Sequence, residues 1–302
     1  MPDPIHTAPT STGTGAMPCA RDEPQSLPKA EHRIALVMNG GVSLAVWMGG
    51  VTHELELLRR ASRGDHADTV PEKEHEVFKI WQKVAQRAGV EVKIDIISGT
   101  SAGGLNGLLL ATGIARGSQL LELRELWRDV ASLDELCRKR RPRQQALLDG
   151  DWFKDQVDEV LSGMLRGPES QERVTLFVTA TALDGRHRAY EDDAGNAFSV
   201  RDHRRMYRFR NEPESFRYVE KGARWELEKR AIREFAEAHN EALVTAARAT
   251  ASYPVAFQPV SEHPLLAYRV HPDKRLDVPA SCVMDGGVLN NAPFTPRPQR
   301  DH

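Results

Sequence analysis

Residues 94–111 read IDIISGTSAGGLNGLLLA, and this segment decides the expected fold. An apolar run ends at Ser98, a glycine-rich turn follows, and a second apolar run begins at Leu105. The first run is typical of a buried strand and the second of a buried helix. Because a short turn joins them, Ser101 is expected at the carboxyl end of a strand in an α/β protein.

Ser101 is the central residue of a G-x-S-x-G pattern, which is typical of a nucleophile elbow. An elbow lifts the serine hydroxyl off the end of the sheet, and flanking glycines avoid steric clash in the turn. The amide groups and positive end of the following helix point toward any anion formed there. A small residue in a tight turn is the alternative. The elbow motif comprises Gly99, Thr100, Ser101, Ala102 and Gly103.

Two strand–turn–helix units follow one another in the sequence. Residues 33–38 form an apolar run that stops at the glycine loop 39–41, and an apolar-periodic helix is expected over 42–60. A second strand is expected over 90–98, before the elbow and its helix. Two such units in succession predict a mainly parallel central sheet flanked by helices. Further strands are expected at 174–183 and 281–284.

Other segments are less regular. The charged residues 223–252 are expected to form one long amphipathic helix that ends before Pro254, because proline cannot continue it. The polar segment 184–222 carries no clear pattern. Trp47 and Trp81 fall on apolar helix faces and are expected in the core.

A nucleophilic serine needs a base, and Asp285 is the candidate. It ends the last expected strand, at the sheet edge where sites of open α/β folds form. A Ser–Asp–His order is not expected, because His302 is the only histidine after Asp285. His263 and His271 are interpreted as loop residues. A carboxylate within about 3 Å of the hydroxyl can act as the base itself. An aspartate that merely opens a glycine turn is the alternative reading of Asp285.

Acyl transfer also needs donors for the oxyanion, and the glycine loop 39–41 offers exposed backbone amides. A phosphate-binding loop or a simple turn is the alternative. The P-loop pattern requires a lysine that is absent here, so nucleotide binding is the weaker functional option.

Four blocks together resemble the patatin-like phospholipase family. They are NGGVSLAVWMGG at 39–50, the elbow, RATASYPVAFQPV at 248–260 and DGGVLNNAPF at 285–294. The resemblance covers residues 33–294 and implies a patatin-like, three-layer α/β domain. It further implies that Ser101 is the nucleophile and Asp285 its base. The implied oxyanion hole comprises Gly40, Gly41 and Val42, and the implied Asp-Gly-Gly motif includes Gly286 and Gly287.

The resemblance implies a serine acyl hydrolase that acts on lipid esters of the phospholipase A type, with no cofactor and no metal. Peripheral contact with a membrane is an open expectation, and transacylation is another. Where the family's loop usually has glycine, a basic residue and glycine, this chain has Asn39, Ser43 and Leu44, so substrate preference is open. A truncated, non-catalytic relative that acts as an interaction or phosphate-ligand-binding protein is the competing hypothesis.

Composition limits the partners and the location. Lys and Arg total 41 against 43 Asp and Glu, which gives a net charge of −2 and no general attraction to nucleic acid. We therefore expect no nucleic-acid partner. Two basic clusters, 138–143 and 201–210, are interpreted as solvated surface, with a grip on anionic headgroups as the alternative. Three widely spaced cysteines, Cys19, Cys137 and Cys282, favour reduced thiols and a cytoplasmic location.

The chain divides into three parts on composition. The Pro-, Ser- and Thr-rich residues 1–32 predict a disordered lead-in without a secretory signal. The acyl hydrolase domain is expected over 33–294. The polar, proline-broken tail 295–302 predicts a truncation point. No apolar run reaches the ~18 residues of a spanning helix. The sequence leaves the oligomeric state open.

Overall fold

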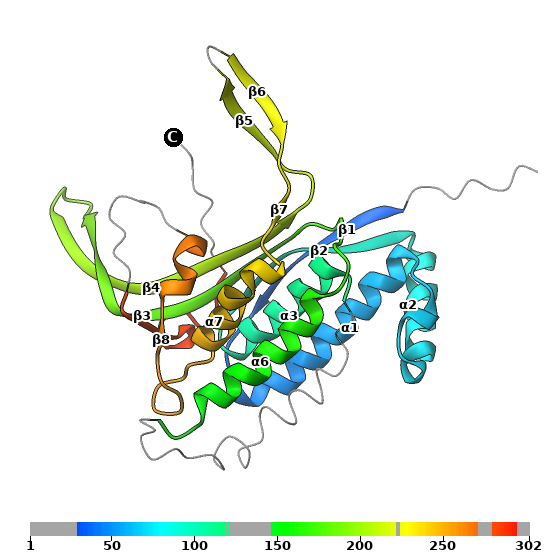
Figure 1. The fold of residues 1–302 in the computed structure, drawn as a ribbon, viewed down its shortest axis with the longest axis horizontal. Helices are drawn as coiled ribbons and strands as arrows, with labels where there is room; N and C mark the ends of the chain where they lie inside the picture. The colour runs from blue at the N-terminus through cyan, green and yellow to red at the C-terminus, as the bar shows by residue number, and fades with distance from the viewer. Residues whose placement is uncertain (1–28, 119, 121–145, 222–223, 271–279, 295–302) are drawn as a thin grey trace, which may run out of the picture.

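A computed structural model describes residues 29–118, 120, 146–221, 224–270 and 280–294. Its largest feature is a seven-stranded sheet in the order β1-β2-β3-β4-β7, with β9 also paired to β3 and β8 paired to β9 (Figure 1). The strands of this sheet are β1 (Ala30–Met38), β2 (Val90–Gly99), β3 (Val174–Glu191), β4 (Ala197–Glu212), β7 (Ile232–Arg233), β8 (Val260–Ser261) and β9 (Cys282–Asp285).

The strands β1, β2 and β3 run parallel and bring two loops to one edge of the sheet. Met38 at the end of β1 is paired with Gly99 at the end of β2. Gly99 is in turn paired with Val178 of β3. Because the ends of β1 and β2 are level, the glycine loop after Met38 and the elbow after Gly99 emerge side by side.

Strand β9 lies beyond the end of β2, along the same edge of β3. β2 pairs with β3 at residues 175–178, whereas β9 pairs antiparallel with β3 at residues 180–182. Asp285, the last residue of β9, is paired with Ala180. The long strand β3 thus places the end of β9 opposite the end of β2.

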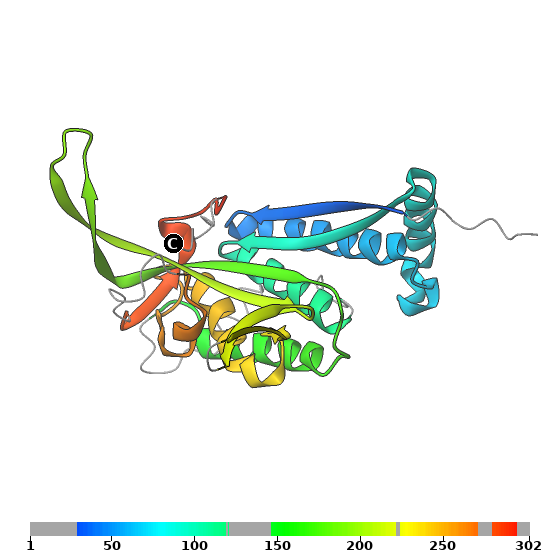
Figure 2. The ribbon, with the colours of Figure 1, turned by 90° about the horizontal axis from the view of Figure 1, so that it is seen from above.

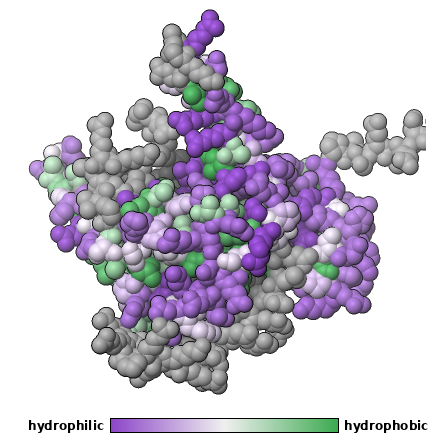
Figure 3. Space-filling model, viewed as in Figure 1, coloured by the Kyte–Doolittle hydropathy of each residue, from purple (hydrophilic) through white to green (hydrophobic). Residues whose placement is uncertain are grey.

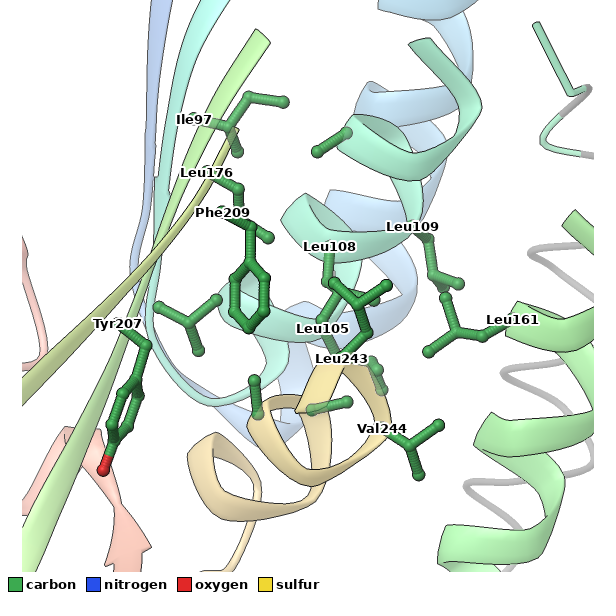
Figure 4. Packing of buried hydrophobic residues seen from close by; sticks show 14 of the residues in the cluster. Ile97, Leu105, Leu108, Leu109, Leu161, Leu176, Tyr207, Phe209, Leu243 and Val244 are labelled. Atoms are coloured by element: carbon green, nitrogen blue, oxygen red, sulfur yellow. The ribbon is translucent and has the colours of Figure 1, made fainter. Parts of the chain in front are cut away.

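Helices cover one face of the sheet (Figures 1 and 2). The apolar side chains of Ile97, Leu176 and Phe209 point from the sheet toward α3 and α7 (Figure 4). On the opposite face of the sheet, the side chains of Ile96 and Arg208 are exposed. Helix α2 (His75–Ala88) packs on α1. In the part of the chain that the structure describes, the helices on the covered face are α1 (Ala45–Arg63), α3 (Ala102–Arg116), α6 (Gly150–Leu165) and α7 (Asn240–Thr250).

The core explains why these segments form these elements. Helix α3 is buried along its whole length up to Ala115, as its apolar and small residues allow. Leu105, Leu108 and Leu109 are at most 2% exposed and meet the side chains of α6 and α7 (Figure 4). The predicted α/β architecture, with a central sheet flanked by helices, is confirmed. The strands β1, β2 and β3 run parallel as expected, whereas β4, β7, β8 and β9 join the sheet by antiparallel pairs.

The prediction of one long helix over 223–252 is wrong. Residues Arg224–Lys229 form strand β6, which pairs with β5 (Phe216–Lys221) as a separate hairpin, and the helix is only α7. Glu, Lys and Arg favour helices, which suggested the wrong element. The alternation of Trp225 and Leu227 with charged residues has the period of a strand, and cross-strand pairing decided the outcome.

The unassigned segment 184–222 is mostly strand. It contains the outer part of β3, all of β4 and all of β5. The basic cluster 201–210 is therefore not a single solvated patch. Arg205 and Tyr207 on β4 are buried, because side chains alternate between the two faces of the sheet. The expectation of a solvated run is wrong for this part.

Trp47 is 66% exposed, so its predicted place in the core is wrong. The buried face of α1 instead contains Ala45, Met48 and Thr52. Trp47 is not on this face, so its side chain points away from the core. Trp81 is partly buried against the cluster around Phe78, which partly agrees with the prediction. Within the described ranges, no helix combines the length and apolar character needed to cross a membrane.

Several predictions concern residues outside the described ranges. They are Cys19, Cys137, His271, the basic cluster 138–143, the tail 295–302 and all of the lead-in except residues 29–32.

Candidate active site

The elbow carries Ser101 in a strained backbone conformation. Ser101 has φ 54° and ψ −126°, between the last residue of β2 and the first turn of α3. A non-glycine residue avoids this region unless its surroundings enforce it, and such strain is concentrated at functional sites. The turn is also tight, because a Cβ on Gly103 would lie 2.4 Å from the Met38 carbonyl oxygen. The glycine at 103 lets α3 approach β1 this closely.

The elbow directs the Ser101 hydroxyl at Asp285. Ser101 Oγ donates a hydrogen bond to Asp285 Oδ2 at 2.7 Å, across 184 positions of sequence. The other carboxylate oxygen, Oδ1, accepts from the Gly287 amide at 2.6 Å. These two bonds fix the plane of the carboxylate, so that one oxygen faces the serine. The two residues proposed from the sequence as nucleophile and base are therefore in direct contact.

Asp285 is 1% exposed. Burial raises the pKa of its carboxyl group above the ordinary aspartate value, whereas the hydrogen bonds from Ser101 and Gly287 lower it in part. A raised pKa makes a carboxylate a stronger base toward a hydroxyl.

The glycine loop lies against the nucleophile. A Cβ on Gly40 would lie 2.9 Å from the Cβ of Ser101, so only glycine permits this approach. Gly41 follows, and Val42 begins a short 3-10 helix that leads into α1. Gly40, the first of the three residues predicted as the oxyanion hole, thus lies beside Ser101.

Asn291 contacts the glycine loop, which the sequence did not indicate. The Gly40 amide donates to Asn291 Oδ1 at 2.9 Å. Asn291 Nδ2 donates to the Gly40 carbonyl at 3.4 Å. The Gly40 amide also lies 3.4 Å from the Asn291 carbonyl oxygen, so a substrate oxygen can use this amide only after Asn291 moves. The asparagines after the Asp-Gly-Gly motif were the signal that could have suggested this contact.

The segment after Asp285 is also fastened to the elbow strand. Thr100 Oγ1 donates to the Asn290 carbonyl at 2.8 Å, and Ser98 Oγ donates to the Pro293 carbonyl at 3.0 Å. Thr100 therefore binds the Asp285 segment, although the sequence indicated it only as part of the elbow pattern.

Other candidates lie elsewhere. His263 is exposed at the start of a 3-10 helix, His263–Tyr268, as expected for a loop histidine. In the ranges that the structure describes, no group of three or more His, Cys, Asp and Glu side chains is placed to hold a metal ion.

The fold and the site define a class: an α/β protein whose strand–turn–helix elbow presents a serine to a buried aspartate beside a glycine loop. Residues 36–297 match the family model of patatin-like phospholipases, and the chain belongs to this family. The chain is also similar to the uncharacterized membrane protein Rv3479 of Mycobacterium tuberculosis, with 31% identity over 295 residues. That match covers 87% of this chain but only 25% of the relative's length.

Proposed function

We propose that this chain is a serine acyl hydrolase that cleaves lipid esters with a Ser101–Asp285 dyad. The observation that supports the proposal most directly is the 2.7 Å hydrogen bond from the serine hydroxyl to the buried carboxylate. Family membership supports an esterase-type or lipase-type hydrolase in general. The proposed acyl hydrolase domain spans residues 33–294.

The proposed reaction has two stages. Asp285 Oδ2 accepts the hydroxyl proton as Ser101 Oγ attacks the ester carbonyl, and the resulting oxyanion binds the amides of Gly40, Gly41 and Val42. Collapse of the tetrahedral intermediate expels the alcohol, which takes the proton from Asp285. Water then attacks the acyl-serine and gives a proton to Asp285. The second tetrahedral intermediate breaks its bond to Ser101 Oγ and releases the carboxylic acid, while Asp285 returns the proton to Ser101 Oγ. Use of the Gly40 amide requires Asn291 to move away, because both its side-chain and main-chain oxygens accept from that amide.

Exposed apolar side chains near the proposed site in sequence support an acyl-chain substrate. Leu44 and Trp47 follow the glycine loop and are 43% and 66% exposed. Val288 and Leu289 follow the Asp-Gly-Gly turn and are 44% and 51% exposed. Exposed apolar residues in groups commonly mark binding surfaces.

Hydrolysis assays test the proposal. Purified protein is given p-nitrophenyl esters of increasing chain length and then phospholipids, beside Ser101→Ala and Asp285→Asn variants. We expect turnover that both substitutions reduce by at least about 10³-fold. Product analysis with an added alcohol acceptor separates hydrolysis from transacylation. Folded protein without turnover on any of these esters would instead support the non-catalytic alternative.

We also propose a cytoplasmic location with peripheral contact to a membrane, through the β5–β6 hairpin. This hairpin extends from the body of the protein (Figure 1) and shows apolar surface at the top of Figure 3. One face carries Phe216, Tyr218, Trp225 and Leu227, each at least 55% exposed. Trp and Tyr favour the headgroup level of a bilayer. The name of the mycobacterial relative, a membrane protein, is consistent with such contact.

Vesicle sedimentation tests this contact. We expect the protein to sediment with vesicles of anionic phospholipid, and a Tyr218→Ser, Trp225→Ser double variant to remain in the supernatant. The hydrolysis of a short soluble ester should be equal in both proteins. Equal sedimentation of both proteins would exclude the hairpin as the contact.

A further inference from the structure

The nucleophile and its base come from distant parts of the sequence, and both of their main chains are bound by the end of one helix. The Ser101 amide donates to Thr250 Oγ1 at 2.8 Å. The Asp285 amide donates to the Ser252 carbonyl at 3.0 Å. Thr250 is the last residue of α7, and Ser252 lies two positions beyond it. We call residues 250–252 the α7 turn.

The hydrogen bond to Thr250 holds the elbow at its strained residue, Ser101. The conformation of Ser101, with φ at 54°, is one that a non-glycine residue adopts only when its surroundings enforce it. A side-chain oxygen from a different element binds the amide of this strained residue. Thr250 is 0% exposed, so water does not replace a lost acceptor easily. A Cβ on Gly104 would lie 2.8 Å from the Thr250 side chain, so the glycine lets α3 approach the threonine closely.

The α7 turn is itself rigidly fixed. Arg248 is 4% exposed and donates to the Gly150 carbonyl at 3.1 Å, to the Gln258 carbonyl at 3.2 Å and to Ser252 Oγ. The Ser252 hydroxyl donates back to the Arg248 carbonyl at 2.6 Å. The guanidinium also lies over the Phe257 ring, 4.7 Å from its centroid. These contacts leave the α7 turn little freedom to shift relative to the sheet.

We propose that Thr250 is a positioning residue, which holds the Ser101 backbone so that the hydroxyl meets the carboxylate on β9. This inference rests on the proposed function for its effect on catalysis. The α7 turn acts as a common support: Thr250 binds the elbow and Ser252 binds Asp285. Thr250 does not touch the substrate or the reacting atoms. It acts by keeping the 2.7 Å contact between Ser101 and Asp285 from loosening.

Three variants separate the effect of the Thr250 hydroxyl group from the effects of side-chain shape and of changing a buried threonine. Thr250→Val keeps the shape and removes the acceptor, whereas Thr250→Ser keeps the acceptor and removes the methyl group. Thr245→Val is the matched control, because Thr245 is a buried threonine of the same helix. If Thr250→Val does not fold, Thr250→Cys replaces it, since a thiol is a weak acceptor of similar size.

Kinetics with a soluble ester provide the first measurement. We expect Thr250→Val to lower kcat about tenfold or more, with KM changed less than about threefold. In Thr250→Val the acid-side midpoint of the pH–rate profile should move to higher pH, because the Ser101 hydrogen bond that lowers the pKa of Asp285 is loosened. Thr250→Ser and Thr245→Val should retain kcat within about threefold. Equal kcat for Thr250→Val and the unmodified protein, or an equal loss in Thr250→Ser, would overturn the proposal.

Amide hydrogen exchange gives a second measurement that does not depend on activity. We expect the Ser101 amide to exchange about tenfold faster or more in Thr250→Val, and at an unchanged rate in Thr250→Ser. If the unmodified protein shows no ester turnover, the proposed hydrolase function fails. The exchange rates then still decide whether Thr250 holds the elbow, and an unchanged rate in Thr250→Val would reject it.

Discussion

The chemistry depends on a carboxylate that is almost fully excluded from water. Asp285 combines burial with two hydrogen bonds, one from Ser101 and one from the Gly287 amide. Burial destabilises the charged form, so the pKa is raised. As pH rises through this pKa, Asp285 gains its function as a base, whereas its own contribution to the stability of the fold becomes less favourable.

Ester hydrolysis should lose activity on the acid side at a pH above the ordinary aspartate pKa of about 3.9. Asp285 accepts a proton only when ionised, so kcat/KM rises as pH increases through its raised pKa. A pH–rate profile with a soluble ester measures this limb. A limb at or below the ordinary value would contradict the assignment of Asp285 as a buried base.

The Asp285→Asn variant should be more stable than the unmodified protein at neutral pH. A raised folded-state pKa means that the folded protein binds the proton more tightly than the unfolded chain, so ionisation above that pKa costs stability. Thermal melts at several pH values measure the difference. It should shrink as pH falls through the raised pKa, and a less stable variant at neutral pH would contradict the argument.

Gly40→Ala should lower activity about 10²-fold or more, without unfolding the protein. The added methyl group would lie 2.4 Å from Asn291 Oδ1 and 2.9 Å from the Ser101 Cβ, so the glycine loop has to shift. A misplaced oxyanion donor has an effect of that size. Gly50→Ala is the control, since no atom lies within 4 Å of the new Cβ. Equal activity of both variants would show that the loop position is unimportant.

The helices and strands differed in how far the sequence predicted them. Strands β1, β2 and β9 and helices α1 and α3 follow from apolar runs that stop at glycines. The sequence did not predict the β5–β6 hairpin, because its Glu, Lys and Arg residues favour a helix locally. Pairing between the two strands determines the strand conformation instead. The Ser101–Asp285 pair was predicted by motif. The contacts of Asn291 and Thr250 with the site could not be predicted from the sequence, because they depend on how distant segments pack.

Helix α6 offers a test of local structure that is independent of the site. The side chain of Asp149 accepts hydrogen bonds from the amides of Asp151 and Trp152, which is the geometry of an N-cap. Asp149→Ala should destabilise the protein by about 0.5–2 kcal/mol in urea unfolding. Asp155→Ala, an exposed substitution on the same helix, should leave the midpoint unchanged. Equal midpoints for both variants would exclude the cap.

At the scale of the whole molecule, a buried ionic cluster joins segments that lie far apart. Glu262 is 0% exposed and accepts from Arg205 at 3.0 Å, from the Tyr207 hydroxyl at 3.1 Å and from the Ala280 amide at 2.5 Å. It thereby connects β4 with the residues just before β9. The strand that ends at Asp285 is thus fastened at both ends.

Glu262→Gln should destabilise the fold by about 3–5 kcal/mol, because it leaves the Arg205 guanidinium buried without its counter-charge. Urea unfolding followed by circular dichroism measures this. Glu76→Gln removes one partner of an exposed pair with Lys79 and should leave the midpoint unchanged. A small loss in Glu262→Gln would mean that Arg205 finds water or another acceptor.

The central claim is that Ser101 is a nucleophile activated by Asp285. The most direct measurement is the mass of the intact protein after treatment with a fluorophosphonate, followed by peptide mapping of the adduct. We predict one adduct, on Ser101, that is absent from Ser101→Ala and forms at least about 10²-fold more slowly in Asp285→Asn. Folded protein that remains unlabelled, or an adduct that forms equally fast without the carboxylate, would contradict the claim.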